Sequence, residues 1–336
     1  MSTQQTIDLS VISPCYNEQE SLAAFLDAIT DALDASGLTY ELVLINDGSL
    51  DRTGELLHAF ASSGRAANVT VVDFSRNFGK ESGILAGLQH ARGQALAIID
   101  SDLQQQPSVM LDMYRQLVEH PEYDCVAAYQ EQRREGLAQR LFKEAFYRTF
   151  NAVTDTQITA DASDFRVFRR NVADALLAVP EYHRFSKGLF AWVGFNTLPW
   201  PYTPDERAGG ESKWSLRKLF RYAFGGIISF STLPLSIATW VGSISSLAAV
   251  IYFFVVLYDT NIAKNTPDGY PTIVCLILLL GGLTLLTLGI IGTYIARIYI
   301  EDKHRPVYIA RSVTTVTNGK AVTTGVQTSN GATVPR

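Results

Sequence analysis

The sequence predicts an α/β domain with a mostly parallel sheet, followed by two apolar helices long enough to cross a membrane. Over roughly the first 200 residues, short β-branched runs alternate with amphipathic helical stretches, which is typical of a parallel sheet with helices on both faces. Later in the chain, no charged residue occurs between Arg221 and Asp259 or between Asp268 and Arg297. Charged residues make up only 18% of the chain, against about 25% in an average domain, so part of it avoids water or is buried on all sides.

The predicted elements of the α/β domain alternate along the chain. The β-branched runs predict strands over residues 7–12, 41–45, 69–74, 95–99 and 125–129. The amphipathic stretches between them predict helices over residues 20–33, 53–61, 80–90 and 108–119. In such a sheet a ligand binds at the carboxyl ends of the strands, so functional side chains are expected directly after each strand.

Composition excludes several classes of protein. Lys and Arg number 28 and Asp and Glu 33, for a net charge of −5, whereas a nucleic-acid binder has a strong basic excess. Three cysteines are too few for a disulfide framework, and the five histidines form no pair with metal-ligand spacing. We therefore expect no nucleic-acid partner, no zinc module and a reducing compartment.

The two uncharged stretches each exceed the roughly 20 apolar residues that a transmembrane helix needs, and we place the spans at 235–257 and 272–295. Two buried helices of a soluble core are the alternative. Basic residues flank the spans on the sides away from the linking loop, which predicts both termini in the cytoplasm and the loop outside. Residues 1–10 lack a signal-peptide pattern. The expected location is therefore the inner (cytoplasmic) membrane, with two passes and a cytoplasmic α/β domain.

These observations divide the chain into four expected regions. Residues 1–205 form the cytoplasmic α/β domain, and 206–233 form a loop and a juxtamembrane amphipathic helix. Residues 234–300 hold the two spans. Residues 301–336 are expected to be a largely disordered tail, because 312–336 are rich in Thr, Val, Gly and Asn without a strong period. A homo-oligomer is left open.

Polar residues follow four consecutive predicted strands. Taken singly, each cluster has an ordinary explanation as a turn, a helix cap or a solvated loop. Four of them at the same edge of a sheet indicate one crevice. The clusters are Ser13-Pro14-Cys15-Tyr16-Asn17-Glu18, Asn46-Asp47-Gly48-Ser49, Ser75-Arg76-Asn77-Phe78-Gly79-Lys80 and Asp100-Ser101-Asp102-Leu103-Gln104.

The fourth cluster predicts a metal site. Asp100, Asp102 and Gln104 alternate with other residues, so an extended segment would direct all three to one side. Carboxylate and amide oxygens suit Mg²⁺ or Mn²⁺ shared with substrate phosphates. The sequence has neither a GxxxxGK[ST] loop nor a GxGxxG after the first strand. A metal bound to a diphosphate, in a chain without a kinase loop, indicates a reaction in which a nucleoside diphosphate is the leaving group.

The runs SVISPCYNEQESL, INDGSLDRT, FSRNFGKESGILAGL and IIDSDLQQQP resemble the family 2 glycosyltransferases, which have the GT-A fold. DFRVFRR, RFSKGLFAWVGF and ERAGGESKWSLRKL extend the resemblance to the polyprenyl-phosphate glycosyltransferases. The resemblance implies an inverting transfer from a nucleotide sugar, UDP-glucose or a relative, to undecaprenyl phosphate. A GDP-mannose enzyme of the same group is the alternative. A polysaccharide synthase or a non-catalytic membrane scaffold fits less well, because the Gln-x-x-Arg-Trp motif is absent and the metal residues are intact.

The resemblance also implies roles for individual residues. The metal ligands would be Asp102, Gln104 and Asp100. Three of the residues implied by the resemblance also have a structural explanation. Tyr16 could be a packed aromatic, Glu18 a carboxylate in the first turn of a helix, and Lys213 part of a membrane-facing loop. The implied nucleotide-sugar contacts are Pro14, Tyr16, Glu18, Asp47, Asp100, Ser101, Arg207, Ser212 and Lys213.

The acceptor side rests on basic, amphipathic stretches. Residues 137–150 and 214–224 carry aromatic and aliphatic residues at helical spacing among Arg and Lys, which predicts helices lying in the membrane interface. Ordinary helices packed on the sheet are the alternative. Candidates for holding the lipid phosphate are Arg133, Arg134, Arg140 and Lys187.

Asp164, in DASDFRVFRR, matches a position that the resemblance puts beside the acceptor. It would accept a proton or orient the attacking oxygen. A structural ion pair with Arg166 or Arg169 is the alternative.

Overall fold

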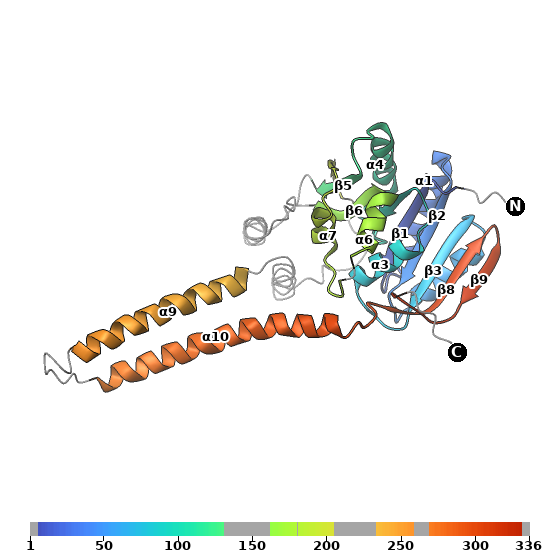
Figure 1. Ribbon diagram of the computed structural model, residues 1–336. Helices are drawn as coiled ribbons and strands as arrows, with labels where there is room; N and C mark the ends of the chain where they lie inside the picture. Colours follow the sequence, from blue (N-terminus) through green and yellow to red (C-terminus); the bar gives the residue numbers. More distant parts are fainter. Residues whose placement is uncertain (1–5, 131–161, 180, 205–232, 259–268, 331–336) are drawn as a thin grey trace. The chain divides into compact units, whose positions relative to one another are not determined.

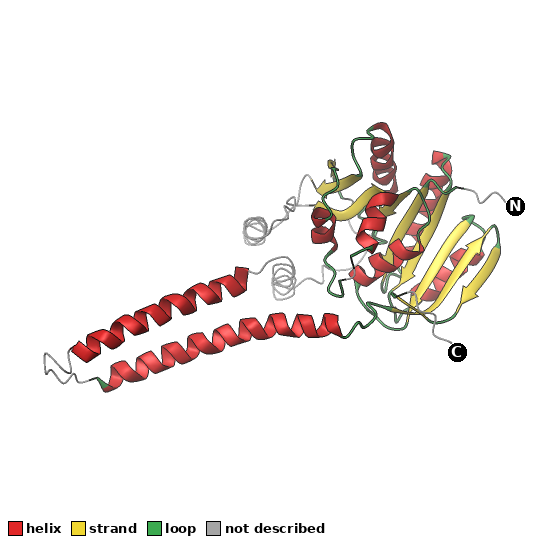
Figure 2. Ribbon diagram, in the orientation of Figure 1, coloured by secondary structure: helices red, strands yellow, loops and turns green. Residues whose placement is uncertain are grey.

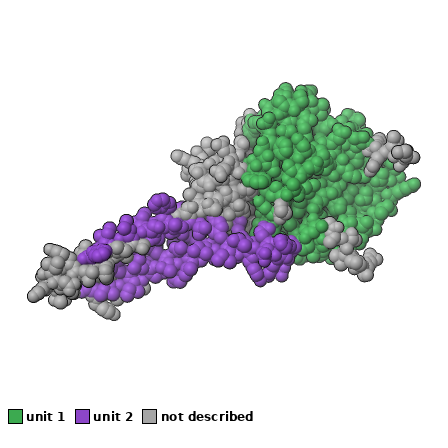
Figure 3. Space-filling view, in the orientation of Figure 1, with its two compact units in different colours: residues 1–219, 306–336 green, residues 220–305 purple. Residues whose placement is uncertain are grey.

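The computed structural model describes residues 6–130, 162–179, 181–204, 233–258 and 269–330. It contains two compact units, coloured separately in Figure 3. The α/β unit comprises Met1–Leu219 and Pro306–Arg336, and the helical unit comprises Phe220–Arg305. The α/β unit therefore contains residues from both sides of the helical unit in sequence.

The described part of the α/β unit contains a ten-stranded sheet, in the order β10-β8-β3-β2-β1-β4-β6-β5-β7 with β9 paired to β8. The five strands predicted from the sequence are present as β1 to β5, and the rest were not predicted. The strands are β1 (Leu9–Cys15), β2 (Tyr40–Asn46), β3 (Asn68–Phe74), β4 (Ala95–Ile98), β5 (Cys125–Gln130), β6 (Ala162–Arg169), β7 (Thr197–Tyr202), β8 (Ile309–Thr317), β9 (Lys320–Thr324) and β10 (Gln327–Thr328).

Helices cover both faces of this sheet (Figure 2). On one face α1 (Leu22–Ser36) contacts α2 (Thr53–Ser62) and α4 (Pro107–Glu119), and together they enclose the main apolar core. On the other face α3 (Lys80–His90) packs on β1 and β2 and contacts α6 (Arg170–Leu177). A short helix, α7 (Ser186–Trp192), contacts β6. All four predicted helices are therefore present.

Strand direction determines where the site lies. Strands β1 to β4 are mutually parallel neighbours, so their carboxyl ends meet at one edge of the sheet. Strand β6 runs antiparallel to β4, with Ile98 opposite Arg166. The start of β6 therefore lies at the same edge as the end of β4, and Asp164 is two residues beyond the last paired position, as Asp100 is on β4.

The prediction of a disordered C-terminal tail is wrong for residues 309–328. Strand β8 pairs antiparallel with β3 along its length, with Asn68 opposite Thr317, and β9 and β10 pair with β8 (Figure 1). Val313 and Val316 are buried, and Tyr308 stacks on Phe74 with ring centroids 4.7 Å apart. The Thr and Val content that suggested disorder is also strand-favouring, and the pairing partner lies too far away in sequence for a local pattern to reveal it.

The helical unit contains α9 (Leu233–Tyr258) and α10 (Tyr270–Asp302), which include the two predicted spans. Within the described residues, one stretch, Leu279–Asp302, is long and apolar enough to cross a membrane, and none of its most apolar window is buried. Helix α9 contains no charged residue, and Trp240, Ile244 and Phe254 on it are exposed. The two-pass arrangement remains a prediction. The predicted interfacial helices, 137–150 and 214–224, lie outside the described residues.

Candidate active site

The loops that follow β1 and β2 are tied together by hydrogen bonds. The Asn17 backbone N–H donates to Ser49 Oγ at 3.1 Å, and Asn17 Oδ1 accepts from the Leu50 N–H at 2.8 Å. The Glu18 N–H donates to Thr53 Oγ1 at 2.9 Å. Tyr16, on the β1 loop, is 41% exposed, so the packed-aromatic alternative for this residue does not hold.

Asp47 connects the β2 loop to the β3 loop. Its carboxylate is buried and accepts the Phe78 N–H at 2.7 Å and the Gly79 N–H at 2.9 Å. Burial raises the pKa of Asp47 to about 6, although these hydrogen bonds favour the charged form. Gly48 allows the close approach, because a Cβ there would lie 2.3 Å from the Arg76 carbonyl carbon. Asp47 therefore holds the β3 loop; its predicted contact with the nucleotide remains a prediction.

Lys80, the first residue of α3, connects the β3 loop to the ends of β4 and β6. Its ammonium lies 2.7 Å from Asp100 Oδ1 and 3.1 Å from Asp164 Oδ2. Burial opposes the charge on Lys80, but the two carboxylates raise its pKa above the usual range. The four predicted clusters thus contact one another in sequence order; that they line one ligand crevice remains a prediction.

Asp164 pairs with Lys80 rather than with the arginines beside it. Arg166 donates to the Ser163 carbonyl, and Arg169 donates to the carbonyls of Tyr123 and Leu117. Burial opposes ionisation of Asp164, but the charges of Lys80, Lys187 and Arg166 outweigh it and hold its pKa well below the usual range. Its second oxygen, Oδ1, is buried and has no hydrogen-bond partner within the described residues.

Glu81 joins α3 to α7 beside this group. Its carboxylate accepts the Ser186 N–H at 2.9 Å and also the Ser186 hydroxyl. Burial, followed by the negative charge of Asp164, raises the pKa of Glu81 to about 7. The predicted lipid-phosphate residue Lys187 follows Ser186 directly, and its charge acts on Asp164. This brings Lys187 into the same electrostatic cluster as Asp164.

The prediction that Asp100, Asp102 and Gln104 alternate along an extended segment is wrong. Residues 101–105 form a turn in which Leu103 has φ +62°, and the Gln104 N–H donates to Asp102 Oδ1 at 3.1 Å. Gln105, not Gln104, is buried against Asp100: its Oε1 accepts the Asp100 N–H at 2.8 Å and its Nε2 donates to Asp100 Oδ2 at 3.1 Å. The local alternation could not reveal this turn.

The donor set of this turn still suits a hard divalent cation, because Asp100 and Asp102 offer only oxygen atoms. In the described ranges, no group of three or more His, Cys, Asp or Glu side chains is placed to hold a metal ion. Among the described residues the side chains therefore offer few ligands, and substrate phosphates would supply others. Ser101, a predicted nucleotide contact, is buried.

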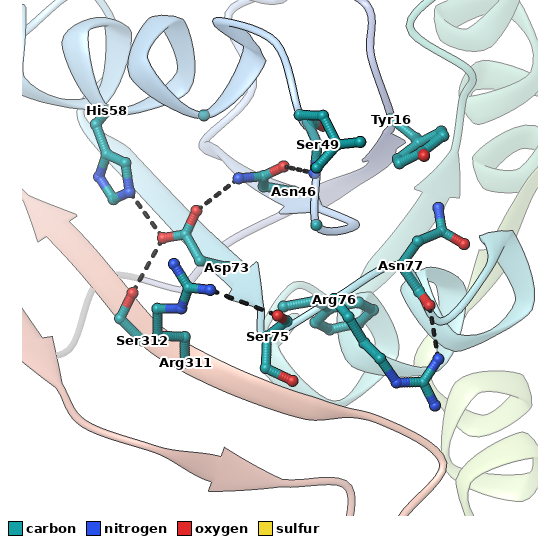
Figure 4. A pocket seen from close by; sticks show the side chains of 14 residues that line it. Tyr16, Asn46, Ser49, His58, Asp73, Ser75, Arg76, Asn77, Arg311 and Ser312 are labelled. Atoms are coloured by element: carbon teal, nitrogen blue, oxygen red, sulfur yellow. Dashed lines mark hydrogen bonds and ion pairs between the residues drawn. The ribbon is translucent and has the colours of Figure 1, made fainter.

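A cavity of about 560 Å³ opens between the β1, β2 and β3 loops and β8 (Figure 4). Tyr16 and Arg76 line it on the side of the predicted nucleotide residues, and Arg311 and Ser312 of β8 line it on the other side. In this cavity Asp73 accepts hydrogen bonds from three side chains: Asn46 Nδ2 at 2.9 Å, His58 Nε2 at 2.7 Å and Ser312 Oγ at 3.1 Å. The cavity is thus built partly by the segment that was expected to be disordered.

Several predicted site residues lie outside the described residues: Arg133, Arg134, Arg140, Arg207, Ser212 and Lys213. Sequence reasoning gave no role to Lys80, Glu81, Gln105 or the pair His58–Asp73. Only Lys80 carried a signal, since it closes the polar cluster after the third predicted strand. The others depend on tertiary contacts.

The fold thus brings two carboxylates and a lysine together at the carboxyl ends of the parallel strands. The model of the family "Glycosyl transferase family 2" matches residues 10–177. The chain belongs to this family, and it is a glycosyltransferase with the GT-A fold.

Curated relatives match most of the chain. It is 37% identical over 308 residues to an uncharacterized glycosyltransferase, YkcC, of Bacillus subtilis (strain 168), covering 91% of this chain and 94% of the relative. It is 37% identical over 308 residues to a prophage bactoprenol glucosyl transferase homolog of Escherichia coli (strain K12), covering 91% and 99%. It is 36% identical over 307 residues to a bactoprenol glucosyl transferase of Shigella phage SfV, covering 90% and 98%.

Solved structures similar to the chain include mannosyl-3-phosphoglycerate synthase from Rubrobacter xylanophilus, at 16% identity and a TM-score of 0.48, covering 66% of this chain and 72% of that one. Another is glucosyl-3-phosphoglycerate synthase from Mycobacterium tuberculosis in complex with Mn²⁺, uridine diphosphate and glucosyl-3-phosphoglycerate. It is 18% identical, with a TM-score of 0.45, and covers 65% and 76%.

Proposed function

We propose that the protein transfers a sugar, with inversion, from a nucleotide sugar to a polyprenyl phosphate at the cytoplasmic face of a membrane. The observation that carries this proposal is the joining of Asp100 and Asp164 by Lys80 at one edge of the sheet. Relatives named bactoprenol glucosyl transferase align over about nine-tenths of this chain and nearly all of their own length. Their names favour undecaprenyl phosphate as acceptor, glucose as the sugar and therefore UDP-glucose over GDP-mannose as donor.

The donor side of the site is formed by the loops of β1, β2 and β4. The base and ribose enter along Tyr16, whose ring is exposed beside the cavity. Asp100 and Asp102, with Gln104, would hold Mg²⁺ or Mn²⁺. When bound, this ion neutralises the charge that develops on the departing diphosphate.

The acceptor side is formed around Asp164. A phosphate monoester has its second pKa near 6, so it is largely dianionic at pH 7 and needs no strong base. Asp164 is itself held ionised by Lys80, Lys187 and Arg166, and a carboxylate with so low a pKa accepts a proton poorly. Asp164 therefore does not hydrogen-bond the dianionic phosphate itself. It holds Lys187, whose charge acts on it, at the acceptor side, so that this cation can position the attacking phosphate oxygen.

The test uses purified protein in detergent, undecaprenyl phosphate and radiolabelled UDP-glucose, other UDP-sugars and GDP-mannose. We expect lipid-linked glucose from UDP-glucose, and no product after EDTA treatment. Asp164→Asn should lower kcat by about 100-fold or more with near-normal donor binding, and Asp102→Asn should abolish most turnover. Asp112→Asn, an exposed carboxylate on α4 paired with Arg115, is the matched control and should be fully active.

Three outcomes would contradict the proposal. Product from GDP-mannose alone would show that GDP-mannose, not UDP-glucose, is the donor. Full activity in EDTA would show that the reaction needs no metal. Wild-type kcat in the Asp164→Asn variant would remove Asp164 from the acceptor site, whereas a parallel loss of melting temperature and donor affinity would assign it a structural role.

A further inference from the structure

Two carboxylates face one another across neighbouring strands at the centre of the site. Asp100 follows β4 and Asp164 lies near the start of β6, and both are two residues beyond the paired positions Ile98 and Arg166. Like charges directly opposite on antiparallel strands destabilise a sheet. The ammonium of Lys80 lies between them, 2.7 Å from Asp100 Oδ1 and 3.1 Å from Asp164 Oδ2.

The backbone before Lys80 is fixed. Gly79 has φ +96°, a conformation that side-chain-bearing residues rarely adopt, and its N–H is held by Asp47. Lys80 then begins α3, whose core-facing residues are buried against β1 and β2. The backbone from which the Lys80 side chain extends is therefore held by the buried Asp47 carboxylate before it and by the packed helix α3 after it. The Lys80 side chain itself is 39% exposed, so its two ion pairs, rather than packing, hold its ammonium between the carboxylates.

The two oxygens of Asp164 differ in their surroundings. Oδ2 is paired with Lys80, whereas Oδ1 is buried and without a hydrogen-bond partner among the residues that the structure describes. Leaving a buried carboxylate oxygen unsatisfied is costly, and such atoms call for a functional explanation. The ion pair at Oδ2 fixes the rotation of the carboxylate and so leaves Oδ1 in one defined position.

We propose that Lys80 is a positioning residue for the transfer reaction, which orients Asp164 by holding its Oδ2 and separates it from Asp100. This inference rests on the proposed function. In the reaction an acceptor phosphate oxygen forms a bond to the anomeric carbon, and the bond from that carbon to the diphosphate oxygen breaks. The electron pair of the broken bond leaves with the nucleoside diphosphate. Lys80 gives up no proton and forms no bond; it acts through Asp164.

The experiment compares Lys80→Met, which keeps the length of the side chain without its charge, with Lys80→Arg, which keeps the charge. We expect Lys80→Met to lower kcat by about 100-fold, the scale of a misplacement of about 1 Å in a site, with the KM for the donor changed less than about threefold. Lys80→Arg should recover at least a tenth of the wild-type kcat. The matched control is Lys320→Met, an exposed lysine on β9, which should behave as wild type.

A double variant tests whether Lys80 acts through Asp164. If it does, Lys80→Met combined with Asp164→Asn should have nearly the kcat of Asp164→Asn alone. Melting temperatures of all variants are measured on the same preparations.

Multiplying losses in the double variant would overturn the inference, as would a wild-type kcat for Lys80→Met. A lowered melting temperature with a raised donor KM, not restored by Lys80→Arg, would assign Lys80 a structural role instead. If the wild-type protein transfers no sugar to the lipid, the proposed function fails and this inference fails with it. If the wild type is active and Lys80→Met is equally active, only the inference on Lys80 fails.

Discussion

At the scale of single residues, His58 and Asp73 form an ion pair next to the cavity. His58 Nε2 lies 2.7 Å from Asp73 Oδ2, and their side chains are 42% and 13% exposed. The hydrogen bond to Asp73 raises the pKa of His58 in spite of partial burial. Burial opposes ionisation of Asp73, but His58, Asn46 and Ser312 outweigh it and lower its pKa. The pair therefore connects α2, β3 and β8.

The contribution of this pair to stability depends on pH in a defined window. Because the His58 pKa is raised, its contribution is complete below the unfolded value of 6.5 and is lost as the pH rises through the folded pKa. Because the Asp73 pKa is lowered, its contribution is present above the unfolded value of 3.8 and is lost as the pH falls through the folded pKa. Both contributions are therefore present together between these two unfolded values.

We predict that His58→Gln lowers the melting temperature most in that window. The difference between wild type and variant should be largest at about pH 5 to 6 and should shrink at pH 8. Melting is followed by intrinsic fluorescence of the protein in detergent, with the exposed His120→Gln as the control for loss of a histidine. A difference that does not change between pH 5.5 and pH 8 would show that the ion pair contributes nothing to stability.

At the scale of elements, β8 covers an edge of the sheet that would otherwise be exposed. Without it, β3 would present unpaired backbone N–H and C=O groups, which favour aggregation. The β8 segment also buries Tyr308, Val313 and Val316. Full burial of a large apolar side chain contributes roughly 1.5–3 kcal/mol, so the segment contributes several kcal/mol in addition to its hydrogen bonds.

We predict that a chain ending at residue 305 loses sugar transfer and aggregates, because β3 is then uncovered and Arg311 and Ser312 no longer line the cavity. A chain ending at residue 330 keeps every strand and is the matched control. Size-exclusion chromatography and the lipid-linked transfer assay measure the two effects. A soluble, active protein ending at residue 305 would contradict the structural role given to β8.

The elements that were predicted correctly are those with a local signal. Strands β1 to β5 and helices α1 to α4 follow from alternation between short β-branched and amphipathic stretches. Strands β6, β7 and β8 depend on partners far along the chain; Thr70 and Thr315, for example, are neighbours across 245 positions. The same holds within the site. Asp100 could be singled out by its place after a predicted strand and Asp164 by the resemblance, but the ion pairs of Lys80 with both depend on tertiary contacts.

The prediction for the segment after β4 was wrong for a related reason. Period-2 alternation is a rule for extended chain, and Leu103 adopts a positive φ that nothing in its residue type requires. Gln105 is buried because its amide satisfies Asp100. Conversely, Asp47 follows β2 like a ligand contact, yet both of its oxygens accept backbone N–H groups of the neighbouring loop. The position of these residues after the strands predicted that they lie close together. It did not predict which of them contact other residues of the protein rather than a ligand.

At the scale of the whole molecule, the arrangement in the membrane can be tested by cysteine labelling. We predict that a cysteine at position 265, between α9 and α10, reacts with an impermeant thiol reagent added to intact cells. A cysteine at the exposed position 320 on β9 should react only after the cells are opened. The background lacks Cys15, Cys125 and Cys275. Labelling at position 320 in intact cells would contradict a two-pass arrangement with cytoplasmic termini.

The return of the chain to β3 also sets an order of assembly during synthesis. Residues 309–317 leave the ribosome only after both apolar helices have been made. The β3 edge therefore stays unpaired while α9 and α10 are synthesised. Contacts of such long sequence separation form late in folding. Completion of the catalytic sheet therefore waits until both helices have been synthesised.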